Sequence, residues 1–313
     1  MSSFSPQEEH KPLPYPGVLN AWLAFIRPKT CSIAISPVIA ALSLAYVETN
    51  SFDLLKAAAT ILLAVLVIVL SNMQNDLGYT QRKAEKGNRK GLPRATSNNW
   101  ISIKSAQTAI ASLALLALVD TILLSISAGW GFIIVGLLCI IAAYCYMGGP
   151  KPLAYGPFSE AIVLIFYGLV AVVGTYYIQT HEISSASMLL GLAVGSIASA
   201  VLCVNNFRDH EHDRSVGRQT LAVVIGESAY KKIFISYMTL PYVMSVAIAV
   251  IHPELTGALA AFATIHLIPR IINGFQTLKG YELNQVMFSV IQLEVKYSLA
   301  FSVGILASNA ILQ

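Results

Sequence analysis

The sequence predicts an all-α integral membrane protein with nine transmembrane helices, and three observations support this fold class. Of the 313 residues, 56% are hydrophobic and only 12% are charged, whereas about 25% of an average soluble chain is charged. The mean hydropathy is +0.66. The apolar residues form long runs, near the roughly 20 residues that a helix needs to cross a bilayer, and do not alternate as barrel strands would. The composition therefore excludes a soluble enzyme, a nucleic-acid-binding protein and a secreted domain stabilised by disulfides.

The chain is expected to begin with a short polar part that precedes the membrane domain. Residues 1–17 are polar and contain several prolines, with no apolar run behind a basic start. We therefore expect that they are not a cleaved signal peptide. Residues 20–27, which include Trp22, are expected to form a short helix at the membrane interface that ends at Pro28. Residues 18–313 are expected to form a single membrane domain.

Nine apolar runs are each expected to cross the membrane. They cover residues 31–48, 54–75, 105–127, 129–147, 160–179, 186–206, 230–251, 255–273 and 291–312. The loops after the second, fourth, sixth and eighth runs are basic. They contain Arg82, Lys83, Lys86, Arg89, Lys90, Arg94, Lys151, Arg208, Arg214, Arg218, Lys231, Lys232, Arg270 and Lys279. The other loops are short and nearly free of Lys and Arg. The positive-inside bias therefore predicts a cytoplasmic amino terminus, cytoplasmic basic loops and a carboxyl terminus on the opposite side.

The first polar segment, residues 71–94, begins inside the second predicted span. Asn72, Asn75 and Asp76 have the spacing i, i+3 and i+4. This spacing places two amides and a carboxylate on one helical face near the cytoplasmic end of the span.

The second polar segment, residues 205–220, continues the sixth predicted span. Asp209 and Asp213 are four residues apart, and Asn205 lies four residues before Asp209. The three side chains are therefore expected to share one helical face. His210 and His212 lie between the aspartates and are interpreted as solvated residues, not as metal ligands.

The composition of these two segments indicates a site for a metal ion and a phosphate. Mg²⁺ prefers oxygen ligands and is typically held by one or two carboxylates together with substrate phosphates. Nearby Arg and Lys would neutralise the remaining phosphate charge. In the alternative interpretation, the basic residues only determine topology and the carboxylates are their surface partners. Polar side chains in apolar helices are costly and are usually functional, which favours the first interpretation.

Four stretches of the chain resemble a known family in the same order. They are Arg27-Pro28-Lys29-Thr30, residues 72–94, residues 146–152 with Tyr155 and Glu160, and residues 205–220. Together they resemble the UbiA-type superfamily of intramembrane prenyltransferases, and they are most similar to the 1,4-dihydroxy-2-naphthoate polyprenyltransferases of menaquinone synthesis. The nine-helix bundle is also that family's fold. Enzymes of the superfamily that act on other aromatic acceptors resemble these loops less.

The resemblance implies a Mg²⁺-dependent transfer of a polyprenyl group from its diphosphate to an aromatic acid. When the acceptor is 1,4-dihydroxy-2-naphthoate, it implies loss of CO₂ and formation of demethylmenaquinone. It also implies a protein that lies among lipids in the inner membrane of a bacterium. The catalytic carboxylates implied are Asp76, Asp209, Asp213 and Glu160. The Mg²⁺ ligands implied are Asn75, Asp76, Asp209 and Asp213. The substrate-binding residues implied are Asn72, Arg27, Lys29, Arg94, Tyr146, Lys151, Arg208 and Arg214.

One position departs from the family pattern. The family's first motif usually carries a second aspartate three residues after Asp76, where this chain has Tyr79. If Asn72, Asn75, Asp76 and Glu85 still serve the first metal, the phenol of Tyr79 is expected to contact the diphosphate directly. The loss of a carboxylate also leaves open a paralogue that binds a prenyl lipid without turnover. A transporter is a further alternative, but it would place charges near the middle of the membrane.

Overall fold

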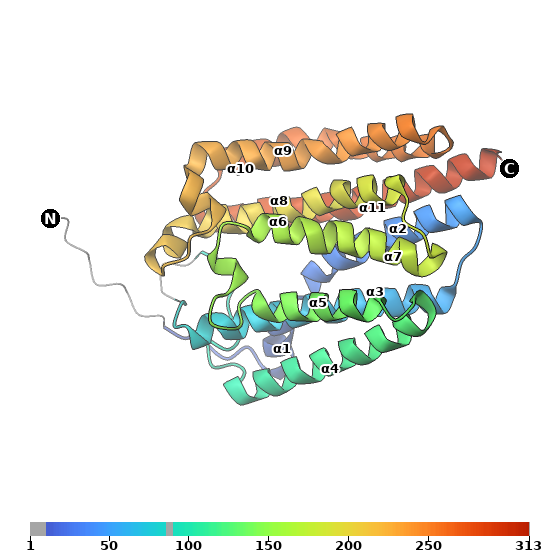
Figure 1. Cartoon of the computed structure of the whole chain (residues 1–313). Coiled ribbons are helices and arrows are strands. Elements are labelled where there is room, and N and C mark those ends of the chain that lie inside the picture. Colours follow the sequence, from blue (N-terminus) through green and yellow to red (C-terminus); the bar gives the residue numbers. More distant parts are fainter. Residues whose placement is uncertain (1–10, 86–89, 313) are drawn as a thin grey trace.

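The computed structural model describes residues 11–85 and 90–312, and this part of the chain is helical and contains no strand. The bundle consists of α1 (Val18–Ile26), α2 (Cys31–Thr49), α3 (Leu54–Gln81), α4 (Ile103–Ala128), α5 (Phe132–Cys145), α6 (Ser159–Val163), α7 (Ala171–Thr180), α8 (Ser185–Ser215), α9 (Leu221–Ile251), α10 (Ile268–Thr277) and α11 (Leu283–Leu312). The long helices run side by side along one direction (Figure 1). Residues 1–10, Lys86 and Arg89 lie outside the described residues.

Among the described residues, eight helical segments are long and apolar enough to cross a membrane. This confirms the all-α membrane class, with one difference from the nine predicted spans. The fourth predicted span, 129–147, folds as α5, which has 14 residues. A helix of that length extends about 21 Å, less than the hydrocarbon thickness of about 30 Å. α5 ends early because the chain turns at Gly148 and Gly149, and Gly149 has a φ of +70°.

Two of the membrane segments combine different kinds of helix. A π-helical segment, Leu164–Val170, joins α6 to α7, so that the three form one segment, Ser159–Thr180. A 3₁₀ segment, Pro253–Leu267, continues into α10. The helix predicted for residues 20–27 is present as α1, and Arg27 ends it in a left-handed conformation with a φ of 58°.

α8 is the central helix of the bundle. It packs against α9, α11 and the π-helical segment. The contact with the π-helical segment is very close, because a Cβ atom on Gly168 would lie 2.3 Å from the backbone oxygen of Gly191. Small residues at such contacts let two membrane helices approach backbone to backbone. This contact fixes the position of residues 164–170 against α8.

The polar segments gather at one end of the bundle. The carboxyl ends of α3 and α8 and the loop between α5 and α6 lie at the same end, and the carboxyl end of α11 lies at the opposite end (Figure 1). The polar segments and the carboxyl end of α11 thus lie at opposite ends of the bundle (Figure 1). This arrangement brings together two polar segments that are more than 100 residues apart in the chain.

Candidate active site

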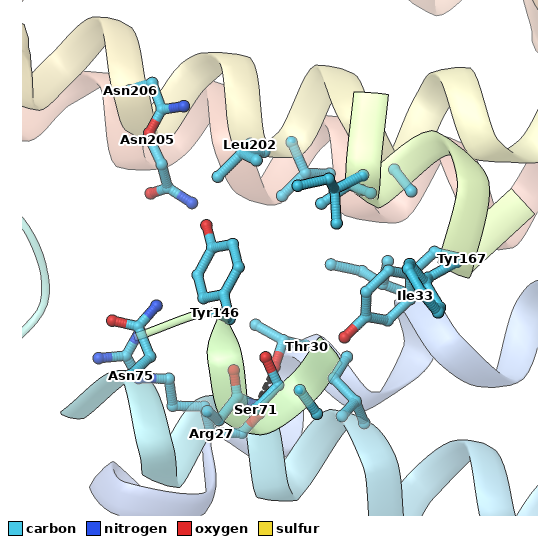
Figure 2. Close-up of a pocket in the computed structure, with 18 of the residues that line it drawn as sticks. Arg27, Thr30, Ile33, Ser71, Asn75, Tyr146, Tyr167, Leu202, Asn205 and Asn206 are labelled. Carbon is cyan, nitrogen blue, oxygen red and sulfur yellow. Dashed lines mark hydrogen bonds between the residues drawn. The ribbon is translucent and has the colours of Figure 1, made fainter. Parts of the chain in front are cut away.

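The two polar segments face a common cavity of about 200 Å³, which we call the chamber. Its polar lining comes from α3, α8, the α1–α2 link and three loops, and includes Arg27, Asn72, Asn75, Tyr79, Arg94, Tyr146, Asn205, Asn206, Arg208, Asp209 and Arg218. In Figure 2, Asn75 and Arg27 lie on one side, Asn205 and Asn206 lie on the other, and Tyr146 lies between them. The chamber therefore joins amide, carboxylate and guanidinium groups of both segments.

Asn72 connects α3 to the link between α1 and α2. Its side-chain nitrogen donates to the backbone oxygen of Ile26 at 3.0 Å and to the hydroxyl of Thr30 at 2.9 Å. The Thr30 hydroxyl in turn donates to the backbone oxygen of Arg27 at 2.9 Å. Asn72 thus helps to hold Arg27 at the chamber wall.

Arg94 lies beside Asn75 and Tyr79 and is almost fully buried. Its guanidinium donates to Oδ1 of Asn75 at 3.0 Å and pairs with Glu85 at 3.2 Å. The guanidinium carbon also lies 3.5 Å from the ring centroid of Tyr79, which is a close cation–π contact. These contacts orient a buried positive charge at the chamber wall.

Asp76 has a different environment from its neighbours on α3. It is completely buried and does not line the chamber. Its carboxylate accepts hydrogen bonds from the backbone nitrogens of Ala95 and Thr96, both at 2.9 Å, and from the Thr96 hydroxyl at 2.6 Å. The structure therefore shows Asp76 as the anchor of the loop that positions Arg94, and a metal-binding role for Asp76 stays a prediction.

Tyr79 and Asp213 share one partner, Arg218. The Arg218 guanidinium donates to the Tyr79 hydroxyl, to the Asp213 carboxylate at 2.7 Å and to the backbone oxygen of Ala154. Burial by itself would lower the pKa of Arg218, but the neighbouring Tyr79 and Asp213 more than offset burial and raise it. Arg218 is therefore positively charged. Tyr79, which accepts one of its hydrogen bonds, also lines the chamber.

The sequence placed Arg218 among the basic residues of the second polar segment, but we did not predict it as a site residue. The available signal was its position five residues after Asp213, directly after the Gly217 turn, where φ is +77°. Such a turn folds the chain back onto the end of α8. Arg82 was missed in the same way, since it donates to the backbone oxygen of Met147 at 2.6 Å and to that of Gly149. These two arginines fix the loop between α5 and α6.

Asp209 lines the chamber and forms a two-point pair with Arg208. The Arg208 Nε donates to one carboxylate oxygen of Asp209 at 3.0 Å, and the terminal nitrogen donates to the other at 2.7 Å. The second terminal nitrogen of Arg208 donates to Asn284 at the start of α11. Asp209 is thus the predicted carboxylate that the structure places at the chamber wall.

Glu160 lies behind the chamber wall and supports it. It is 1% exposed, and its carboxylate accepts hydrogen bonds from Asn206 at 2.9 Å and from the Tyr230 hydroxyl. Because Asn206 lines the chamber and Glu160 does not, Glu160 positions an amide in this structure.

Three predicted phosphate partners do not line the chamber. Lys29, Lys151 and Arg214 are all exposed. The ammonium of Lys29 lies 5.3 Å from the ring centroid of Phe288. The predicted cations that the structure brings to the chamber are Arg27, Arg94 and Arg208, and the structure adds Arg218.

The donor set is compatible with a hard divalent cation that is bound together with a phosphate. Within residues 11–85 and 90–312, no group of three or more His, Cys, Asp or Glu side chains is placed to hold a metal ion by itself. The chamber does contain the carboxylate of Asp209 and four asparagine amides. Mg²⁺ is usually held by one or two carboxylates and completes its coordination with water and phosphate oxygens. The residues present therefore fit Mg²⁺ when the substrate supplies the remaining oxygens.

Known proteins resemble this chain in both sequence and fold. The sequence profile described as the UbiA prenyltransferase family matches residues 34–281. The chain is 31% identical to a 1,4-dihydroxy-2-naphthoate octaprenyltransferase from Haemophilus influenzae, over 92% of this chain and 96% of that protein. It is 36% identical to the enzyme of the same name from Escherichia coli, over 66% of this chain and 69% of that protein.

A solved structure shares the fold at lower sequence identity. It is the structure of a UbiA homolog from Archaeoglobus fulgidus bound to GPP and Mg²⁺. The TM-score is 0.63 with 16% identical residues, and the match covers 90% of this chain and 99% of that one. The helical bundle seen here is thus shared with that structure.

Proposed function

The chain belongs to the UbiA prenyltransferase family, and we propose that it transfers a polyprenyl group from polyprenyl diphosphate to 1,4-dihydroxy-2-naphthoate, a step of menaquinone synthesis. The observation that carries this proposal is the convergence of both polar segments on one chamber. The chamber combines a carboxylate, four amides and four guanidinium groups at its polar end with an apolar wall further along α3 and α8. This combination suits a ligand with a highly charged head and an apolar tail.

The guanidinium groups are proposed to bind the diphosphate. Arg27, Arg94, Arg208 and Arg218 line the chamber, and Arg94 and Arg218 are almost fully buried. In a site with little water, such fixed charges stabilise a leaving group whose negative charge grows in the transition state. Arg208 now pairs with Asp209, so diphosphate binding would offer this guanidinium a second anionic partner.

Mg²⁺ is proposed as the metal, and its ligands are proposed as Asn75, Asp76, Asp209 and Asp213. When bound, Mg²⁺ would neutralise charge on the diphosphate oxygens. Asn75 and Asp209 line the chamber, which supports their part in this set. The carboxylates of Asp76 and Asp213 contact the residue 95–96 backbone and Arg218, respectively. By pairing with Arg218, Asp213 favours the charged guanidinium group and holds it at the chamber wall.

In the proposed reaction, the allylic C–O bond of the donor breaks, and the diphosphate leaves with the bonding electrons. The ring carbon that carries the carboxylate forms a bond to the allylic carbon. The carboxylate then leaves as CO₂ and returns its bonding electrons to the ring. The allylic cation must be protected from water, and the apolar residues Ile33, Val67 and Phe166 line the part of the chamber away from the guanidinium groups.

The acceptor is proposed to bind near Tyr146. This side chain lies between Asn75 and Asn205, with its hydroxyl directed toward Asn205 (Figure 2). A phenol and an amide at this position could hold the hydroxyl or carboxylate group of an aromatic acid by hydrogen bonds.

The protein is proposed to lie in the inner membrane of a bacterium, with the chamber opening toward the cytoplasm. The basic loops and the chamber share one end of the bundle, which supports this sidedness. The relatives in Haemophilus influenzae and Escherichia coli support a bacterial setting.

The test is direct turnover by the purified protein. It is incubated in detergent with Mg²⁺, a labelled prenyl diphosphate and a panel of aromatic acids that includes 1,4-dihydroxy-2-naphthoate, 4-hydroxybenzoate and homogentisate. We expect a prenylated product with loss of CO₂ from 1,4-dihydroxy-2-naphthoate, and no product after chelation of the metal. Preferred prenylation of another acid would overturn the acceptor, and no product with any acid would overturn the activity.

A further inference from the structure

A short segment before α1, which we call the arm, docks near the chamber and is not used in the reaction described above. The arm consists of residues 11–16, Lys-Pro-Leu-Pro-Tyr-Pro, and leads to α1 at the polar end of the bundle (Figure 1). Leu13 lies between two prolines, and proline has no backbone N–H. Within residues 12–14, the backbone donor that can dock the arm is therefore the N–H of Leu13.

Two side chains of the loop before α4 bind the backbone of Leu13. The Leu13 nitrogen donates to Oδ1 of Asn98 at 2.7 Å, and the Leu13 oxygen accepts a hydrogen bond from the indole nitrogen of Trp100 at 3.2 Å. The side chain of Leu13 is about half exposed, at 47%. The arm is thus docked by specific hydrogen bonds more than by apolar packing of Leu13.

Asn98 also holds Arg94. Its side-chain nitrogen donates to the backbone oxygen of Arg94 at 2.7 Å, and its backbone nitrogen donates to the same oxygen at 3.1 Å. Asn98 is buried, so its amide would be costly to leave without partners. Because the oxygen and nitrogen of an amide lie in one plane, the hydrogen bond from Leu13 to Oδ1 also orients the nitrogen toward Arg94.

The turn that carries Arg94 is therefore held by two elements that are distant in the chain. On α3, Asp76 accepts hydrogen bonds from the backbone nitrogens of residues 95–96. From the arm, Leu13 acts through Asn98. The guanidinium of this fixed turn reaches the chamber wall and contacts Asn75 there.

We propose that Asn98 is a positioning residue for the diphosphate site, and that the docked arm keeps Asn98 in the orientation that holds Arg94. The proposal rests on the function proposed above, in which Arg94 binds the diphosphate. A long side chain loses conformational freedom when it binds a ligand, and a backbone that is already fixed lowers this cost. Loss of the Asn98 contacts therefore weakens diphosphate binding and leaves acceptor binding unchanged.

The test measures the dissociation constant of geranyl diphosphate in the presence of Mg²⁺, by calorimetry on the full chain in detergent. Asn98→Leu removes both side-chain hydrogen bonds without adding charge, and it is expected to raise this constant by about fivefold to tenfold. The dissociation constant of 1,4-dihydroxy-2-naphthoate is measured in parallel and is expected to change by less than about twofold. A general loss of structure would instead weaken the binding of both ligands.

Leu13→Pro removes the N–H donor of the arm. Leu13 already precedes a proline, which favours an extended backbone, and three successive prolines keep that conformation. This variant is expected to raise the dissociation constant of geranyl diphosphate by about threefold. Added to Asn98→Leu, it is expected to have no further effect, because both substitutions act through one hydrogen bond. Additive effects would overturn the coupling of the arm to Asn98.

Leu13→Ala is the matched control, because it keeps both backbone groups and shortens a half-exposed side chain. Its dissociation constant for geranyl diphosphate is expected to stay within about twofold of that of the unsubstituted protein. Amide hydrogen exchange over residues 90–101 is expected to become faster in Leu13→Pro and Asn98→Leu but not in this control. Size-exclusion profiles confirm that each variant is folded, and Leu13→Pro serves if Asn98→Leu is not.

Binding and turnover are measured separately, so the outcomes separate this inference from the function on which it rests. If Asn98→Leu weakens geranyl diphosphate binding but the unsubstituted protein prenylates no acceptor, the inference holds and the proposed transfer is overturned. If the unsubstituted protein is active and the folded variants bind geranyl diphosphate as tightly as it does, the transfer stands and the positioning role of Asn98 is overturned. Absence of binding by the unsubstituted protein would overturn both.

Discussion

The two polar segments contain the same types of residue at similar spacings, but their carboxylates have different surroundings. In the first segment, Asp76 is turned away from the chamber and binds the backbone of residues 95–96. In the second, Asp209 lines the chamber and Asp213 pairs with Arg218 behind the wall. The first segment therefore presents amides and a phenol to the chamber, and the second presents a carboxylate.

This difference shows how the chain accommodates Tyr79 where the family usually has an aspartate. Arg94 stacks on the Tyr79 ring, and Arg218 donates to its hydroxyl. Two guanidinium groups are thus oriented by one uncharged side chain. An aspartate at this position would be anionic beside both arginines. A phenol at this position, in place of a carboxylate, would leave more positive charge available to the diphosphate proposed above.

The largest expected effect is at Asp209. Asp209→Ala is expected to lower turnover on the order of 100-fold or more, because it removes the carboxylate at the chamber wall and the anionic partner of Arg208. Glu211→Ala is the matched control, since it removes an exposed carboxylate two residues away. Near-normal turnover of Asp209→Ala at saturating Mg²⁺ would contradict the role assigned to the second segment.

A smaller effect is expected at Tyr79. Tyr79→Phe keeps the ring under Arg94 and removes one of the acceptors of Arg218. We therefore expect kcat/KM to fall by the equivalent of roughly 1.5–3 kcal/mol, as for one hydrogen bond to a charged group. Tyr79→Asp is expected to lower the Mg²⁺ concentration that gives half-maximal activity. If neither substitution changes kcat/KM or the Mg²⁺ dependence, Tyr79 takes no part in the reaction.

Asp76 is expected to affect stability as well as activity. Asp76→Asn weakens two buried hydrogen bonds to backbone nitrogens, so we expect the free energy of unfolding in detergent to fall by roughly 1–3 kcal/mol. Faster proteolysis after residue 90 would report the loosened loop. A higher Mg²⁺ requirement at unchanged stability would instead identify Asp76 as a metal ligand and make the two segments equivalent.

The smallest effect on activity is expected from cysteine substitutions that test on which side of the membrane the polar segments lie. Single cysteines at Asn99 and Ser215, both exposed near the polar end, are introduced in a background without the four native cysteines. Both segments should be labelled by an impermeant thiol reagent only after the cytoplasmic face is opened. Labelling of just one of them from outside intact cells would place the segments on opposite sides and is incompatible with a common chamber.

Much of the fold and part of the site follow from local sequence. Runs of apolar residues predict membrane helices because a buried backbone in lipid must satisfy its own hydrogen bonds. The i, i+3 and i+4 spacings in 71–94 and 205–220 predict polar helical faces, and both faces reach the chamber through Asn75 and Asp209. The length of α5 was not predicted, because the apolar run of 129–147 includes residues 129–131 and 146–147, which lie outside the helix in the structure.

The sequence by itself determined which residue types occur at the polar end of the bundle and on which helices they lie. It did not determine which carboxylate faces the chamber, since Asp76 and Asp209 have the same local pattern. Partners distant in the chain decide this orientation. The backbone nitrogens of residues 95 and 96 donate to Asp76, and Arg218 pairs with Asp213. The position of the π-helical segment is likewise a product of packing, because Gly168 lies in close contact with Gly191 and Gly195. A buried polar group binds the nearest partner that removes its desolvation cost, and only the tertiary structure brings that partner into reach.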